Sequence, residues 1–445
     1  MNKVAIIGLD CAEPSLVFDK WRDDLPCLKR LMDNGKWKRL RSTDPPITVP
    51  AWTSMMTGKD PGELGLYGFR NRKDHSYGGY AFANSTMIKH DLVWDVLSRS
   101  GKEVLLLGVP QTFPPKKVNG NMVTCFLSVS TKYQYTYPVD LKMEVEEVSD
   151  GYVLDVTDFR TDDKDALLGR IYEKAEKHFK VAKHLVATKP WDFFMMVEMG
   201  IDRIHHAFWK YMDETHPKYE KGNRYQDVIK EFYQYCDNQM NELISLFPAD
   251  TTIIVVSDHG AKRLVGGVCF NEWLIEQGFL SLESYPQEVT PIDKVSIDWS
   301  RTRAWGDGGY YGRLFLNVLG REPQGIILPE DYEDVRRELI SKIEAIEDDK
   351  GRNIGSRAYR PEDLYKECNG IPPDLIVYFG DLEWRSVGSV GSKSILTFEN
   401  DIGPDDANHD WHGIFIISGS DIDNEYMESM DIYKMNSLVL NLMRA

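Results

Sequence analysis

Short apolar runs rich in β-branched residues alternate with helical patterns along most of this chain. Between Asp227 and Phe247, apolar residues recur at every third or fourth position, which describes the buried face of an amphipathic helix. This pattern leads directly into the apolar run TTIIVV at 251–256. Such alternation predicts right-handed βαβ units, and therefore an α/β fold whose mostly parallel sheet is sandwiched by helices. Buried strands are expected at Val4–Leu9, Glu103–Gly108, Asp192–Glu198, Thr251–Ser257, Leu314–Val318, Asp374–Tyr378 and Gly413–Ser418.

Three stretches lack this regular alternation. Residues from about 60 to 90, 125 to 180 and 285 to 370 are richer in charge, Tyr, Gly and Pro. We interpret them as insertions or a cap that shapes access to a site. Because there is no Pro/Ser-rich linker and no internal repeat, residues 1–445 are expected to form a single α/β core that carries these inserted cap segments.

The charge balance excludes some partners. The 445 residues include 53 Lys and Arg against 70 Asp and Glu, a net charge of −17. Binding to a nucleic-acid polymer needs a basic surface, so none is expected, and an anionic substrate would need local positive charge that metal ions could supply. No apolar run approaches the roughly 20 residues of a membrane span, and no signal peptide is recognised. We expect a cytoplasmic protein without a membrane span; its oligomeric state is open.

Acidic residues and histidines stand where the predicted strands end. Asp10 ends the first strand, Asp258 and His259 end the strand TTIIVVSDHG, and Asp202 follows a third, with His206 four residues later. An aspartate at a strand end often only caps a helix, and His206 alone could be an ordinary helix histidine. Three such strand ends on one sheet edge form a pattern that chance rarely produces, and carboxylates beside imidazoles suit zinc or manganese.

Two further histidines precede the last predicted strand. His409 and His412 lie in ANHDWHGIFIISG, just before Gly413–Ser418. If this strand is antiparallel to the others, its start lies at the same edge as their ends. One of the two histidines can then complete a site, and geometry alone does not choose between them.

Thr48 in PPITVPAWTSMMTG is the nucleophile candidate. Pro50 can occupy the first turn of a helix, which would place Thr48 beside a helix N-terminus, where free amides favour an oxyanion. The alternative is that Thr48 is merely an N-cap. A threonine hydroxyl is a poor nucleophile at neutral pH, but coordination to a divalent cation lowers its pKa.

Taken together, these residues match a known family. The chain resembles the type I phosphodiesterase/nucleotide pyrophosphatase branch of the alkaline phosphatase superfamily, especially its bacterial and archaeal predicted phosphohydrolases, and so implies an alkaline-phosphatase-like fold. The resemblance covers residues 4 to 419, in the blocks VAIIGLD, PPITVPAWTSMMTGKDPGELG, PQTFPP, NGNMV, DRIHHAFWKYMDETHP, VVSDHGA, NEWL, LNVLGREPQG and NHDWHGIFIISG.

The resemblance also implies two divalent metal ions, with zinc expected first and manganese or iron fitting as well. His409 is preferred to His412 because the family pattern has a His four residues before the Gly-Ile-Phe strand. The resemblance places the ligands in two groups: Asp10, Thr48, Asp258 and His259 for one ion, and Asp202, His206 and His409 for the other.

The implied activity is hydrolysis of a small phosphate ester, most simply a diester, through a covalent phospho-threonine on Thr48. A phosphomonoesterase on the same core is one alternative, and a non-catalytic binding protein on a decayed enzyme core is another. A sulfatase is disfavoured because no C/S-x-P-x-R motif surrounds Thr48, and a cofactor-independent phosphoglycerate mutase because it uses a serine. Ala51 and Trp52 replace the Asn-His of the relatives and Leu64 replaces a His, which bears on the preferred ester.

Substrate-binding residues are less clearly indicated. His412, Arg203 and Lys262 are candidates because they lie close in sequence to the site residues. Charged side chains of this kind, including Arg70, Arg72 and Arg263, are more often solvated surface groups. The segment AWGDGGYYGRLF at 304–315, with Tyr310 and Tyr311, could line a pocket, although a glycine-rich hairpin is the simpler interpretation.

Overall fold

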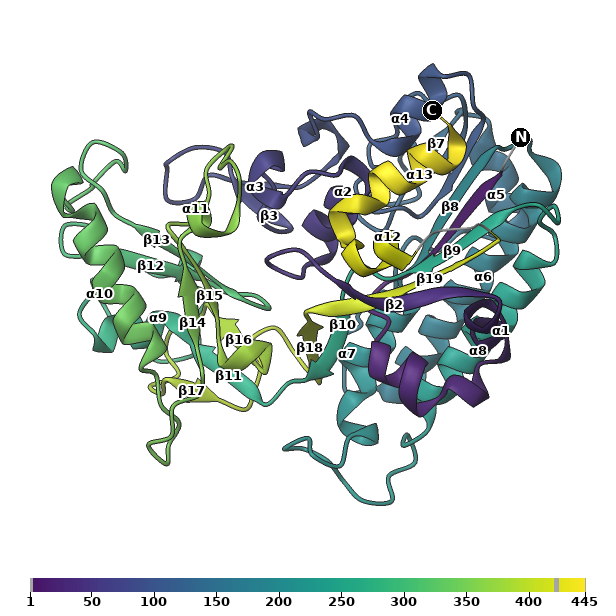
Figure 1. Cartoon of the computed structure of the whole chain (residues 1–445). Helices are drawn as coiled ribbons and strands as arrows, with labels where there is room; N and C mark the ends of the chain where they lie inside the picture. The colour runs from purple at the N-terminus through teal and green to yellow at the C-terminus, as the bar shows by residue number, and fades with distance from the viewer. Residues whose placement is uncertain (1–2, 420–423, 445) are drawn as a thin grey trace.

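A computed structural model describes residues 3–419 and 424–444 of the chain (Figure 1). Its centre is an eight-stranded sheet with the strand order β2-β19-β9-β1-β8-β5-β6-β7. Five neighbouring strands are parallel: β9 (Thr252–Val256), β1 (Val4–Leu9), β8 (Phe193–Glu198), β5 (Val104–Leu107) and β6 (Gly120–Val123). Three are antiparallel to their neighbours: β19 (His412–Ser418), β2 (Gly35–Arg41) and β7 (Thr136–Tyr137). The predicted mostly parallel sheet is confirmed.

Helices cover both faces of this sheet, because its strands are apolar on both sides. In β1, Ala5 and Ile7 pack into one core, whereas Val4 and Ile6 pack into the other. The first core contains α1 (Pro26–Asp33), α5 (Leu141–Ser149), α6 (Lys164–Thr188), α7 (Gly200–Met212) and α8 (Val228–Ile244). The second contains α2 (Thr48–Thr57), α4 (Val93–Arg99), α12 (Asn424–Ser429) and α13 (Met435–Met443). The α/β sandwich predicted from the alternation is therefore observed.

Residues 264–400 form a second body, here called the small lobe, at the left of Figure 1. It has its own hydrophobic core. An antiparallel sheet contains, in spatial order, β12 (Ala304–Asp307), β13 (Gly312–Leu316), β15 (Leu375–Tyr378) and β14 (Arg357–Tyr359). A second sheet contains β16 (Trp384–Val387), β11 (Gly266–Cys269) and β17 (Leu396–Thr397), and the helices are α9 (Phe270–Glu276), α10 (Tyr332–Glu344) and α11 (Pro361–Leu364). The expected glycine-rich hairpin is the β12–β13 pair.

The three irregular stretches lie in different places. Residues 285–370 belong to the small lobe. Residues 60–90 carry α3 (Pro61–Leu64), β3 (Arg70–Arg72) and β4 (Tyr80–Phe82), and they reach the small lobe, where the Tyr67 hydroxyl donates to the Asn369 carbonyl at 2.8 Å. Residues 125–180 contribute β7, α5 and most of α6, which pack with the central sheet. The division of the chain into domains stays a prediction.

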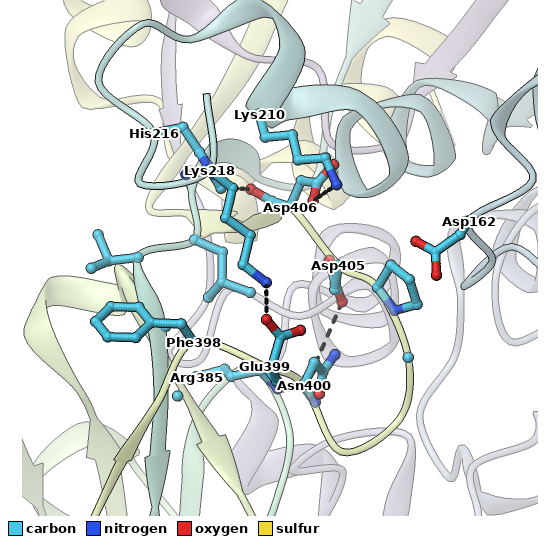
Figure 2. Close-up of a pocket in the computed structure, with 16 residues that line it drawn as sticks. Asp162, Lys210, His216, Lys218, Arg385, Phe398, Glu399, Asn400, Asp405 and Asp406 are labelled. Carbon is cyan, nitrogen blue, oxygen red and sulfur yellow. Dashed lines mark hydrogen bonds and ion pairs between the residues drawn. The ribbon is translucent and has the colours of Figure 1, made fainter. Parts of the chain in front are cut away.

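The small lobe is joined to the rest of the chain by two strands that pair with each other. The chain leaves the central sheet through β10 (Gly260–Arg263) and returns through β18 (Ala407–Asp410), which is antiparallel to it. A cavity of about 220 Å³ lies at this junction, lined by residues of α7, the loop after it and segment 398–406 (Figure 2). No helix among residues 3–419 and 424–444 is long and apolar enough to span a membrane.

Candidate metal centre and active site

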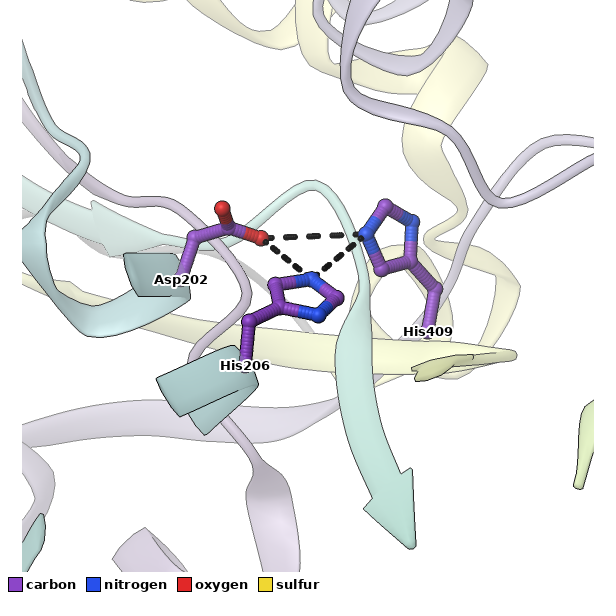
Figure 3. A group of neighbouring side chains, drawn as sticks. All are labelled: Asp202, His206 and His409. Carbon is purple, nitrogen blue, oxygen red and sulfur yellow. Dashed lines mark hydrogen bonds and ion pairs between the residues drawn. The ribbon is translucent and has the colours of Figure 1, made fainter. Parts of the chain in front are cut away.

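One group of metal-ligand side chains comes from helix α7 and strand β18 (Figure 3). The helix begins at Gly200, directly after β8, so Asp202 lies in its first turn and His206 one turn later, on the same side. The His206 Nε2 atom is 3.3 Å from Asp202 Oδ1 and 3.3 Å from His409 Nε2. His409 Nε2 is 3.7 Å from Asp202 Oδ1. All three side chains are buried.

A second group lies at the ends of β1 and β9. Asp10, Asp258 and His259 are fully buried, with His259 Nε2 at 3.1 Å from Asp258 Oδ2 and 3.9 Å from Asp10 Oδ1. Thr48 Oγ1 lies 3.3 Å from the same His259 nitrogen. The two groups adjoin, because the rings of His259 and His409 stack with centroids 3.8 Å apart. The seven residues predicted as ligands are therefore gathered in one place.

Thr48 is the first residue of helix α2 and is not its N-cap. The N-cap is Ile47, whose side chain makes no capping hydrogen bond. The alternative that Thr48 is merely an N-cap is therefore wrong. The threonine hydroxyl thus stands at the positive end of the helix dipole, next to the group of Asp10, Asp258 and His259. This placement suits an oxygen that gains negative charge.

His412 lies apart from both groups. It begins β19, is exposed, and pairs with Arg41 of β2. β19 is antiparallel to β9, as expected if its start shares the edge where the other strands end. His409 lies three residues earlier, on β18, where it is opposite Ala261 of β10. Its side chain is buried in the centre.

The donor atoms fit divalent cations. Asp10 Oδ1, Asp202 Oδ1 and Asp258 Oδ2 are buried, accept no hydrogen bond, and face histidine Nε2 atoms at 3.1–3.9 Å, and leaving such oxygens without a hydrogen bond or a bound cation is costly. Ligands about 2.0–2.1 Å from a tetrahedral zinc ion stand about 3.3–3.4 Å from one another, close to the spacings found in both groups. Carboxylate and imidazole donors at this spacing therefore fit divalent metal ions.

The electrostatics of the groups also favour bound cations. Burial and the neighbouring Asp258 carboxylate raise the pKa of Asp10 well above its ordinary value. Burial opposes the charged form of His259, but Asp258 raises its pKa to about 9. Burial and the nearby His259 lower the pKa of His409 well below its usual range, which keeps it neutral, as a metal ligand must be. Acids packed this closely need compensating positive charge.

Four of the proposed ligands are each held by a further hydrogen bond. His206 Nδ1 bonds Asp405 Oδ1 at 2.7 Å, and the Nδ1 atoms of His409 and His259 lie 2.8 and 3.1 Å from the carbonyls of Pro46 and Gly260. These contacts direct Nε2 of each imidazole into the centre. The Trp52 indole N–H donates to Asp10 Oδ2 at 2.7 Å, so the residue that departs from the family pattern orients a carboxylate here.

The charged substrate-binding candidates are already paired with carboxylates. Arg203 is buried between Asp202 and Asp155, donating to the Asp155 oxygens at 3.0 and 2.7 Å. Lys262 pairs with Asp410 at 3.0 Å and with Asp381 at 3.3 Å. Arg70, Arg72 and Arg263 pair with acids of the small lobe: Asp307, Glu322 and Glu383.

Three residues that were not among the predicted ligands lie at the same sheet edge or against the histidines: Tyr310, Asp405 and Gln111. Tyr310, in the turn between β12 and β13, has its ring centroid 4.3 Å from that of His409. Asp405 holds His206, and no spacing rule links these two residues. Gln111, after β5, is 1% exposed with neither side-chain polar atom bonded, and its backbone has φ of 67°. Such strain in a non-glycine residue is typical of functional sites.

Comparison with known proteins identifies a matching family. Residues 4–414 match the model of the family described as type I phosphodiesterase / nucleotide pyrophosphatase. GPI ethanolamine phosphate transferase 2 of Candida glabrata is 20% identical over 268 residues, which are 59% of this chain and 26% of that protein. The chain thus spans about a quarter of the length of this relative.

Two solved structures show the same fold over nearly the whole chain. Human ectonucleotide pyrophosphatase/phosphodiesterase 5 has a TM-score of 0.56 and 13% identity, covering 100% of this chain and 95% of the other. Phosphonoacetate hydrolase from Sinorhizobium meliloti, solved with phosphonoacetate, has a TM-score of 0.64 and 14% identity, covering 99% and 95%. At these identities the likeness establishes the alkaline-phosphatase-like fold.

Proposed function

Because the chain belongs to the type I phosphodiesterase/nucleotide pyrophosphatase family, we propose that it hydrolyses small phosphate esters, preferably diesters, with two divalent metal ions and a covalent intermediate on Thr48. One observation carries this proposal. Two buried Asp/His groups adjoin each other, and Thr48 Oγ1 lies 3.3 Å from His259 of the first group at the start of a helix.

We assign the seven residues to two ions, zinc in the first instance, with manganese or iron as alternatives. Asp10, Thr48, Asp258 and His259 would hold the first ion, and Asp202, His206 and His409 would hold the second. When bound, these cations would lower the pKa of the Thr48 hydroxyl and neutralise the oxygens of the phosphoryl group. This charge matters in a chain whose formal net charge is −17.

The proposed reaction consists of two successive displacements at phosphorus. The Thr48 hydroxyl loses its proton to solvent and Oγ1 attacks phosphorus; the P–O bond to the leaving alkoxide breaks, the alkoxide takes up a proton and leaves as the alcohol, and phosphorylated Thr48 forms. A water molecule then loses a proton and attacks the same phosphorus, the P–Oγ1 bond breaks and Oγ1 takes up a proton, which regenerates Thr48 and releases a phosphate monoester from a diester or phosphate from a monoester. The N-terminus of α2 favours negative charge on Oγ1 in both steps, because its amide dipoles point toward it.

The ion pairs around the centre favour a diester. A monoester carries more charge and needs further cationic side chains, whereas Arg203 and Lys262 are each held by two carboxylates. Arg160 pairs with Asp405, which also pairs with Arg385. The two cations expected to bind substrate, Arg203 and Lys262, are thus already neutralised.

The test compares p-nitrophenyl phosphate with bis(p-nitrophenyl) phosphate, using chelator-stripped protein to which zinc or manganese is returned. We expect metal-dependent hydrolysis that is faster for the diester and is lost in Thr48→Ala. The matched control is Thr57→Ala in the same helix, whose hydroxyl donates to the Thr53 carbonyl at 2.7 Å and should not affect turnover. Faster monoester cleavage would indicate a phosphomonoesterase. Binding of metal without turnover of either ester would favour a binding protein.

A further inference from the structure

Asp405 links the centre to the small lobe. Its carboxylate is fully buried and lies in the segment through which the chain returns from the small lobe. Oδ1 bonds His206 Nδ1 at 2.7 Å. Oδ2 is held by two guanidinium groups, with Arg160 Nη2 at 3.1 Å and Arg385 Nη1 at 3.5 Å.

These partners come from both bodies of the molecule. Arg160 precedes α6 of the main body, whereas Arg385 lies on β16 of the small lobe. Arg160 also donates to the Tyr310 hydroxyl at 3.0 Å. The Tyr310 ring stacks on His206 with centroids 5.0 Å apart. One contact between the two bodies is thus made on a proposed ligand of the second ion.

Among residues 3–419 and 424–444, the side-chain hydrogen bonds of the first group stay within the main body. His259 Nδ1 bonds the carbonyl of Gly260, Asp10 accepts from Trp52 of α2, and Asp258 accepts from the Cys11 backbone N–H. The two groups therefore differ in how they depend on the small lobe.

We propose that Asp405 and Arg385 are positioning residues for the second metal ion, so that docking of the small lobe completes the second site and binding of that ion stabilises the docked lobe. This inference rests on the two-ion function proposed above.

The physical argument has two parts. A carboxylate that accepts from Nδ1–H fixes the imidazole tautomer that presents the Nε2 lone pair to a metal, and it increases the basicity of the ligand. Arg160 and Arg385 compensate the buried charge of Asp405, which would otherwise be costly. If the small lobe moves away, Asp405 loses Arg385 and His206 loses its stacking partner Tyr310. By thermodynamic linkage, if docking of the small lobe strengthens binding of the second ion, binding of that ion must stabilise the docked lobe by the same free energy.

Metal titration tests the positioning role. Zinc would be added to chelator-stripped protein in competition with a chromophoric chelator, and the bound zinc counted by elemental analysis. In Asp405→Ala we expect the affinity of one of the two zinc ions to fall about 10–100-fold, with the other unchanged. Asp405→Asn retains an acceptor for Nδ1–H and should lose less. Arg385→Gln should weaken the same ion from the small-lobe side.

Asp406→Ala is the matched control. Asp406 is the next residue, is 2% exposed and lines the same junction cavity (Figure 2), but its carboxylate pairs with Lys210 at 3.4 Å and not with a proposed ligand. Both zinc affinities should be unchanged in this variant. Equal affinities in wild type and in both Asp405 variants, or an equal loss in Asp406→Ala, would overturn the positioning role. If the wild type itself binds fewer than two zinc ions, the proposed function fails, and this inference with it.

Hydrogen exchange tests the coupling. Peptides that contain residues 264–267 and 403–406, at the junction, should exchange more slowly once the second equivalent of zinc binds, and should respond little to the first. In Asp405→Ala the second equivalent should protect them less at equal total zinc. Exchange at the junction that is independent of the second ion would refute the link between ion binding and lobe docking.

Discussion

Gly8 in the middle of β1 makes room for the tryptophan that orients Asp10. A Cβ atom added at Gly8 would lie 2.6 Å from Trp52 Cη2, 2.8 Å from Val197 Cγ2 and 3.1 Å from the Met196 carbonyl oxygen. Two of these separations are shorter than carbon atoms tolerate, and the strand is paired on both sides and cannot retreat. Gly8→Ala must therefore displace the Trp52 ring.

We expect Gly8→Ala to lower the free energy of unfolding by about 1–3 kcal/mol, the usual cost of overpacking a core. Displacement of Trp52 also weakens its 2.7 Å hydrogen bond to Asp10, so the affinity for one zinc ion should fall as well. Guanidinium unfolding of the metal-free protein measures the first effect, and zinc competition measures the second.

Gly169→Ala is the control for this prediction. Gly169 lies inside α6, and an added Cβ would meet no atom within 4 Å. Since alanine is the better helix former, this variant should be more stable by up to about 1 kcal/mol and bind zinc normally. A Gly8→Ala protein as stable as wild type, with both zinc affinities intact, would refute the argument that this glycine is required by the position of Trp52.

Three further predictions follow from single side chains. Gln111→Leu removes a buried amide without partners and should raise the free energy of unfolding in urea by about 1–3 kcal/mol while lowering diester turnover; a less stable protein would contradict this. Burial lowers the pKa of His216 to about 4, so its neutral form favours folding above the unfolded-state pKa near 6.5, and stability is lost as pH falls toward 4; His216→Gln should flatten the unfolding free energy over this interval. Trp52→Phe should weaken the binding of one zinc ion in competition titration, because Asp10 Oδ2 loses its donor, and unchanged affinity would exclude that role.

The fold could be predicted in part from local patterns. The alternation of apolar runs with a helical period correctly indicated a parallel sheet between helices, because strands buried on both faces must be apolar throughout. The same runs did not reveal that 312–316 and 375–378 belong to a separate antiparallel sheet. Hydrophobic periodicity describes the faces of a segment and carries no information about which strand it joins.

The same distinction between local pattern and tertiary arrangement applies to the candidate site. The sequence by itself determined that Asp10, Asp258 and Asp202 meet, since parallel strands deliver their carboxyl ends to one edge, and that His206 joins Asp202 through helical spacing. Only the tertiary structure decided that Asp405 holds His206 across 199 positions of sequence, and that Tyr310 covers the histidines from the small lobe. Those contacts depend on how two separately packed bodies dock, and no local period or spacing encodes that arrangement.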